Sequence, residues 1–138
     1  MYDLEKEKKQ LDEYLSRNKT TSFYELLINH INNYLDGKNL VRKDSIVYNK
    51  AGIDRRLFSK FTRTTGYNFS KNNVLRLCLA LELDLDDTTE LLESSGYSLS
   101  TTKPFDLIIR YYISHGVYDI DKINISLYAL TSTSLSRE

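Results

Sequence analysis

The sequence of 138 residues has no tryptophan and only one cysteine, one proline and two histidines. Cys78 cannot form an internal disulfide, and its apolar surroundings from Val74 to Leu83 are typical of a buried core position. His30, His115 and Cys78 show no metal-ligand spacing. The sequence also lacks a glycine-rich phosphate loop, a nucleophile motif and a dinucleotide fingerprint. We therefore expect a protein that is not an enzyme and that binds no metal and no cofactor.

Long apolar segments are missing as well. No run approaches the length that a helix needs to cross a bilayer, and the first 17 residues are charged throughout, unlike a signal peptide. Hydrophobic residues still make up 41% of the chain, which is enough to form a real core. We expect a folded cytoplasmic protein.

The chain has no net charge, but its charges are unevenly distributed. Residues 37–76 carry ten basic and two acidic side chains, a local charge of +8. Residues 82–138 carry ten acidic and four basic side chains, a local charge of −6. Such an asymmetry favours one surface for an anionic partner and another for solvent or a different protein.

Apolar residues recur at helical spacing along most of the chain, which predicts an all-α fold of seven or eight short helices. We expect a charged helical arm over 1–20, a helical domain over 21–130 and a flexible polar tail over 131–138. The predicted helix starts are marked by Ser22 with Glu25, Asp54, Ser70, Asp86, Pro104, and Asp119 or Asp121. The predicted helix ends are marked by Gly37, Gly52, Gly96 and Gly116, and the apolar helix capped by Ser70 is expected to run from Val74 to Leu83.

The stretch from Leu40 to Leu92 predicts a helix-turn-helix with its supporting helices. Gly52 suits the left-handed conformation of a tight turn, and Ile53 and Phe58 have the spacing of a hydrophobic staple. The second helix of the motif, 55–62, should turn its apolar residues to the core. Its outer side would then carry Arg55, Arg56, Ser59, Lys60 and Arg63.

These segments resemble the XRE (lambda-repressor-like) helix-turn-helix family. The resemblance is carried by Tyr48-Asn49-Lys50-Ala51-Gly52-Ile53, Leu57-Phe58-Ser59-Lys60-Phe61, Asn68-Phe69-Ser70 and the run from Val74 to Asp87. Over residues 22–130 the chain is similar to the helical module found fused to bacterial macro domains or standing alone in bacteria and mobile elements. The resemblance implies a lambda-repressor-like bundle, extended by two C-terminal helices and an N-terminal helical arm, in a bacterial cell.

Three positions depart from the repressor pattern. Asp44 stands where a polar donor is usual, Tyr48 replaces a small alanine, and Phe69 replaces a proline. An acidic side chain at the first helix of the motif would repel phosphates, and a tyrosine in its middle requires wider packing or a rotated helix. These departures weaken the prediction of DNA reading more than the prediction of the fold.

The leading hypothesis is a double-stranded DNA-binding regulator from a bacterium or phage, with a homodimer contact through its C-terminal helices as a further expectation. In this hypothesis the base edges are contacted by Arg55, Arg56, Ser59 and Lys60, because a guanidinium group can donate two hydrogen bonds to guanine. The residues expected to hold the phosphate backbone are Lys43, Lys50, Arg63 and Lys71.

The competing hypothesis is a protein-interaction module that reuses the fold. Its basic face would meet an acidic protein surface, as in a phage or mobile-element inhibitor of a host defence nuclease (anti-CRISPR-like). The arm from Tyr2 to Arg17 would add contacts, and both Asp44 and Tyr48 favour this view modestly.

Tyrosine is unusually frequent, with eleven residues. Tyr111, Tyr112 and Tyr118, near Phe105 and Tyr128, form an aromatic surface on the C-terminal helices in one interpretation. In the other, which we prefer, half of the tyrosines close the core.

Overall fold

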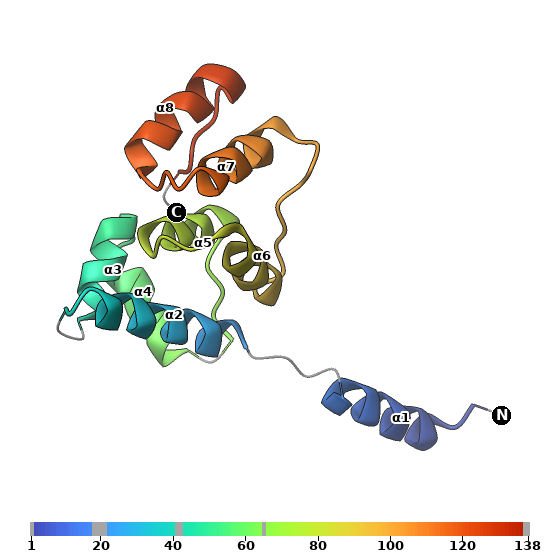
Figure 1. Ribbon diagram of the computed structural model, residues 1–138. Coiled ribbons are helices and arrows are strands. Elements are labelled where there is room, and N and C mark those ends of the chain that lie inside the picture. Colours follow the sequence, from blue (N-terminus) through green and yellow to red (C-terminus); the bar gives the residue numbers. More distant parts are fainter. Residues whose placement is uncertain (1, 18–21, 41–42, 65, 137–138) are drawn as a thin grey trace.

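The computed structural model describes residues 2–17, 22–40, 43–64 and 66–136 (Figure 1). These described ranges form eight helices and no strand, which confirms the all-α prediction. The helices are α1 (Leu4–Arg17), α2 (Phe23–Gly37), α3 (Asp44–Ala51), α4 (Arg55–Arg63), α5 (Lys71–Ala80), α6 (Leu85–Ser94), α7 (Pro104–Ser114) and α8 (Ile120–Thr131). Within the same ranges, every helix is too short or too polar to cross a membrane.

Most helices begin at the predicted capping residue. The side chain of Ser22 accepts a hydrogen bond from the backbone N–H of Glu25, and that of Asp54 accepts one from the N–H of Arg56. Ser70 and Asp119 cap α5 and α8 in the same way. Each cap satisfies a backbone donor that has no partner within its own helix, so the local sequence fixes these starts.

Two predicted boundaries were wrong. Asp84 caps α6, not Asp86: its carboxylate accepts the backbone N–H of Asp87 at 2.8 Å, and Asp86 lies in the first turn. The preceding helix, α5, ends at Ala80 and does not reach Leu83. Glu82 there adopts a left-handed conformation with φ 55°, which reverses the chain early enough for Asp84 to become the cap.

Helix α5 is the centre of the core. Every residue from Asn73 to Ala80 is buried, including Cys78, and the helix contacts α3, α6 and α8 (Figure 1). The apolar side chains of α2 cover another side of this core through Leu27, Ile31 and Leu35. A helix buried on all sides requires a mostly apolar sequence, which is what the run around Cys78 provides, and the two buried polar residues are Asn73 and Arg76.

Helices α7 and α8 pack against each other at the C-terminal end, and α7 also contacts α6. The segment after α8 then returns to the core: Leu135 is 1% exposed, and its backbone N–H donates to the Asn124 side chain at 2.8 Å. The flexibility expected over 131–138 stays a prediction, and residues 137–138 lie outside the described part of the chain, but Leu135 packs on the core. One leucine among serines and threonines is a weak pattern, but its burial and its hydrogen bonds anchor the segment.

The eleven tyrosines divide almost evenly between the core and the surface. Six are half-buried and pack against the core: Tyr34, Tyr48, Tyr67, Tyr97, Tyr112 and Tyr118. The remaining five are exposed: Tyr2, Tyr14, Tyr24, Tyr111 and Tyr128. The interpretation in which half of them close the core therefore holds, and Tyr111 and Tyr128 still leave an exposed aromatic face on α7 and α8.

Candidate nucleic-acid interface

A three-residue turn joins α3 to α4. Gly52 ends α3 in a left-handed conformation with φ 71°, as predicted, and the backbone N–H of Ile53 donates to the carbonyl of Tyr48 at 2.8 Å. Asp54 then caps α4. Ile53 and Phe58, the predicted staple pair, are both almost fully buried. The turn therefore fixes the direction in which α4 leaves α3.

An aromatic cluster holds the inner face of α4 against the core. Phe58 and Phe61 lie on this face, and their rings pack near the ring of Phe69 with centroid separations of 6.4 and 5.2 Å. The ring of Phe23, from α2, meets Phe61 edge-on at 5.7 Å. Tyr48 packs on Phe58 at 5.1 Å, so the side chain that departs from the repressor pattern fills the space between α3 and α4. Aromatic rings give α4 a well-defined orientation.

The outer face of α4 is basic and exposed. Arg55, Arg56, Lys60 and Arg63 are all solvent-exposed, and Ser59 is half-buried between them. An open hollow of about 550 Å³ is lined by Asp54, Arg55, Arg56, Ser59 and Arg63. The five predicted residues of the second helix are therefore brought together on one surface, which we call the α4 surface.

Asp54 is the one α4-surface residue that the sequence prediction did not include. Its carboxylate lies 3.6 Å from the Arg56 guanidinium group, and both side chains are well exposed. The same carboxylate caps α4. The sequence indicated only this capping role, so the position of Asp54 in the hollow was not predicted. The carboxylate lowers the positive potential at the end of the helix that would approach an anion first.

Lys50 lies away from the α4 surface in a network of its own. Its ammonium group donates to the Tyr34 hydroxyl at 2.9 Å and to the Glu82 carboxylate at 3.2 Å. Burial favours the neutral amine and is the largest single effect, but the two hydrogen bonds and the charge attraction of the same partners together outweigh it and raise the pKa of Lys50 above its ordinary value. Lys50 thus connects α3 with α2 and with the turn after α5.

Lys71 is also engaged inside the protein. Its ammonium group binds both carboxylate oxygens of Asp106, at 3.0 and 3.1 Å, and the Asp106 side chain is only 6% exposed. This ion pair connects the start of α5 with α7. Lys43, in contrast, is exposed directly before α3. Of the four predicted phosphate-binding residues, Lys43, Lys50 and Arg63 are exposed and Lys71 is half-buried, and both Lys50 and Lys71 form ion pairs within the chain.

Arg76 accounts for another part of the predicted basic region. It is 7% exposed, and it donates to the backbone carbonyls of Ala51 at 2.9 Å and Leu135 at 2.8 Å. Its place inside the apolar run of α5 was the sequence signal for an interior role. The excess of positive charge that reaches solvent is therefore smaller than the count over 37–76 implies.

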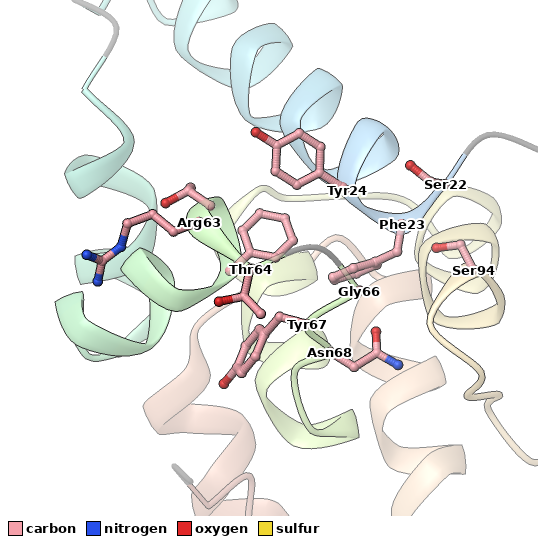
Figure 2. A pocket seen from close by; sticks show the side chains of 11 residues that line it. Ser22, Phe23, Tyr24, Arg63, Thr64, Gly66, Tyr67, Asn68 and Ser94 are labelled. Atoms are coloured by element: carbon pink, nitrogen blue, oxygen red, sulfur yellow. The ribbon is translucent and has the colours of Figure 1, made fainter.

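A second cavity lies beside α4, on the side of α2, with a volume of about 500 Å³ (Figure 2). We call it the aromatic pocket. Its apolar lining comes from Phe23, Tyr24, Phe61 and Tyr67, and its polar lining from Ser22, Thr62, Arg63, Thr64, Asn68 and Ser94, with Gly66 at its edge. No pattern in the sequence indicated it, because its walls come from three separate segments. Over the described part of the chain, no group of acidic, histidine or cysteine side chains is arranged to hold a metal ion.

Comparison with known proteins gives no relative from which to transfer a function. No family model matches the chain, and neither a curated protein nor a solved structure matches it. The assignment of a function therefore depends on the α4 surface alone.

Proposed function

We propose that the chain is a double-stranded DNA-binding protein in which α3, the turn at Gly52 and α4 act as a helix-turn-helix. The observation that carries this proposal is the α4 surface, where four exposed cationic side chains and one hydroxyl lie on the outer side of a short, firmly packed helix. In the XRE-like arrangement that the sequence resembles, α4 is the recognition helix in the major groove.

The residues of the α4 surface fit two kinds of contact. Arg55 and Arg56 lie at the start of α4, where side chains of a recognition helix reach base edges, and Ser59 and Lys60 follow one turn later on the same side. Arg63, at the end of α4, and Lys43, before α3, are placed for phosphates. Lys50 and Lys71 contribute only if phosphate displaces Glu82 or Asp106 from them.

A role in transcriptional regulation by a bacterial or phage protein would use paired half-sites, and hence a dimer. The exposed side chains of Tyr111, Ile125, Tyr128 and Leu130 support the expected contact through α7 and α8. Large apolar side chains exposed on two neighbouring helices are available for such a contact.

A salt titration tests DNA binding directly. The affinity for a short random-sequence duplex should fall roughly 10²–10³-fold between about 50 and about 200 mM salt, since about five cationic side chains, those at base edges included, neutralise phosphate charge and release counterions. The exchange Arg55→Glu should weaken binding about tenfold. It leaves the fold intact, because an acidic residue is favourable in the first turn of a helix. Lys122→Glu, on exposed α8, is the control with the same charge change and should bind as the wild type does.

Two results contradict the proposal: no binding at low salt, or binding that is flat across salt.

A second candidate function is favoured by Asp44 and Asp54, which put a carboxylate at the N-terminus of both α3 and α4. In that case the α4 surface meets an acidic protein surface, as a phage or mobile-element inhibitor of a host defence nuclease would. A pull-down with a stoichiometric protein partner that Arg55→Glu abolishes, at unchanged DNA affinity, would establish this alternative.

A further inference from the structure

Asp54 is the one acidic side chain on the α4 surface. Its Oδ1 atom accepts the backbone N–H of Arg56 at 2.7 Å and lies 3.6 Å from Nε of the same residue. Among the described residues, no hydrogen bond or ion pair engages the second carboxylate oxygen, Oδ2. The side chain is 58% exposed. A carboxylate oxygen is therefore available to a ligand at the start of α4.

The charged neighbours of Asp54 on the α4 surface are all hydrogen-bond donors. Arginine and lysine side chains carry several donors and no acceptor. Within the described part of the chain, the guanidinium group of Arg55 and the ammonium group of Lys60 have no hydrogen-bond or ion-pair partner. Asp54 thus adds a single acceptor to a set of donors, within one helical turn of both Arg55 and Arg56.

The phosphate backbone and the base edges of DNA differ in how they meet a carboxylate. Phosphate oxygens are negatively charged and only accept hydrogen bonds, so they repel Asp54. The major-groove edge of a G·C pair offers both kinds of group, since guanine accepts at N7 and O6 and cytosine donates from its N4 amino group. Adenine also has an amino group, but only guanine offers two acceptors to one guanidinium group. A carboxylate next to a guanidinium group therefore suits a G·C pair.

We propose that Asp54 is a specificity-determining residue of the α4 surface, which selects a G·C pair at the start of α4. Its Oδ2 atom accepts a hydrogen bond from the amino group of the cytosine, while the Arg56 guanidinium group, close to Oδ1, donates to the guanine of the same pair. In water so exposed an ion pair contributes little. Against DNA, where solvent is excluded, the carboxylate restricts the directions that the guanidinium group takes. This inference rests on the proposed function, because it requires α4 to lie in the major groove.

Selection of bound duplexes from a random-sequence pool tests the proposal. The wild type and Asp54→Ser should yield motifs that differ at one position, where only the wild type requires a G·C pair. Serine retains the start of α4, since Ser22 and Ser70 cap α2 and α5 of the same chain. The substitution removes the carboxylate, so a change in the selected base reports a contact with DNA and not the folding of α4.

A cycle of affinity measurements then couples the residue to the base pair. Exchanging that G·C pair for A·T should weaken binding by the wild type about tenfold and binding by Asp54→Ser about twofold or less. Asp84→Ser is the matched control, because Asp84 is also an exposed residue that caps a helix, α6, and its loss removes the same charge. This variant should select the wild-type motif. Circular dichroism shows that each variant retains its helices.

Three results overturn the proposal. If the wild type and Asp54→Ser select the same motif, Asp54 contacts no base, although DNA binding itself stands. If Asp54→Ser binds every duplex more tightly by the same factor, the carboxylate acts by repulsion alone. If the wild type shows no salt-dependent binding to any duplex, the proposed function fails and this inference fails with it. The first two results leave the proposed function intact, which separates its failure from that of the inference.

Discussion

Arg76 places its guanidinium group between two backbone carbonyls, one at the end of α3 and one in the segment after α8. A cation at the C-terminal end of α3 also interacts favourably with the partial negative charge there. One side chain thus connects the start of the turn at Gly52 with Leu135, which lies far along the chain. The cost of burying the charge is offset by hydrogen bonds to groups that would otherwise lack a donor.

We predict that Arg76→Met lowers the free energy of unfolding by about 2–3 kcal/mol, although methionine matches the apolar surroundings. The carbonyls of Ala51 and Leu135 would each lose a donor in the interior. Urea denaturation followed by circular dichroism measures the change. Arg56→Met, whose side chain is 92% exposed, is the matched control and should cost little. Equal stabilities of the two variants would refute the role given to Arg76.

Cys78 makes the stability dependent on pH in the alkaline range. Burial raises the pKa of its thiol from an ordinary value of 9.0 to about 12. As the pH rises above 9, the thiol of the unfolded chain loses its proton first, so the unfolded state binds fewer protons and is favoured.

We therefore predict that Cys78 reduces the free energy of unfolding by about 1.4 kcal/mol for each pH unit between 9 and 12. Tyrosines and lysines also titrate there, so the measurement is the difference between the wild type and Cys78→Ala across this range. The wild type should lose stability faster as the pH rises. A constant difference would show that the thiol ionises in the folded protein as readily as in the unfolded one.

Among the elements, α4 shows how a helix of nine residues acquires a fixed orientation. Its start is set by Asp54 and its inner face by Phe58 and Phe61, while its outer face makes few contacts of its own. The side chain of Arg63 illustrates this, since it donates to the carbonyl of Ser59 within the same helix. The backbone of α4 is consequently held in a fixed orientation, while most side chains of the α4 surface are available for contacts. A surface that binds a ligand through its side chains requires both properties.

The segment after α8 behaves as part of the core despite its polar composition. Leu135 is 1% exposed whereas Leu130, near the end of α8, is 73% exposed. We predict that Leu135→Ala lowers the free energy of unfolding by about 2–3 kcal/mol and that Leu130→Ala changes it by less than about 0.5 kcal/mol. Thermal melts of the two variants provide the comparison. A small effect at Leu135 would restore the expectation of a flexible tail.

The sequence predicted most helix starts because a capping hydrogen bond joins residues two or three positions apart. Ser22, Asp54, Ser70 and Asp119 each act within such a window. The predicted cap at Asp86 failed because Asp84 competes for the same role two residues earlier. Composition and periodicity were therefore sufficient for the helical class and for most helix positions.

The candidate site was only partly predictable. The five residues of the α4 surface follow from one helix and its apolar period, so the sequence could place them together. Lys50, Lys71 and Arg76 bind partners 16, 35 and 59 positions away, and no local pattern contains that information. The aromatic pocket was missed for the same reason.

At the scale of the whole molecule, some of the charges that are unevenly distributed along the sequence form ion pairs between distant segments of the chain. The basic stretch 37–76 meets the acidic half of the chain through Lys50 with Glu82 and Lys71 with Asp106. The second pair spans from α5 to α7 and contributes to holding the C-terminal helices on the rest. Part of the asymmetry in sequence is therefore neutralised within the fold, and the α4 surface retains most of what remains exposed.

We predict that Lys71→Met lowers the free energy of unfolding by about 2 kcal/mol, because it leaves the buried Asp106 carboxylate without its cation. The backbone N–H of Ser100 still donates to this carboxylate at 2.7 Å, which limits the loss. Chemical denaturation measures the effect, and Lys122→Met on exposed α8 serves as the control. If the two lysine variants are equally stable, the pair makes no net contribution.

The absence of tryptophan gives the aromatic pocket an optical use. Tyr24 stands at the side of the pocket, 46% exposed, with its ring 5.1 Å from that of Phe61. A tryptophan placed there would be the single indole of the chain, and its emission would come from this one wall alone. Its emission maximum would shift to shorter wavelength when an apolar segment covers the pocket, so the fluorescence spectrum would report whether the pocket is occupied.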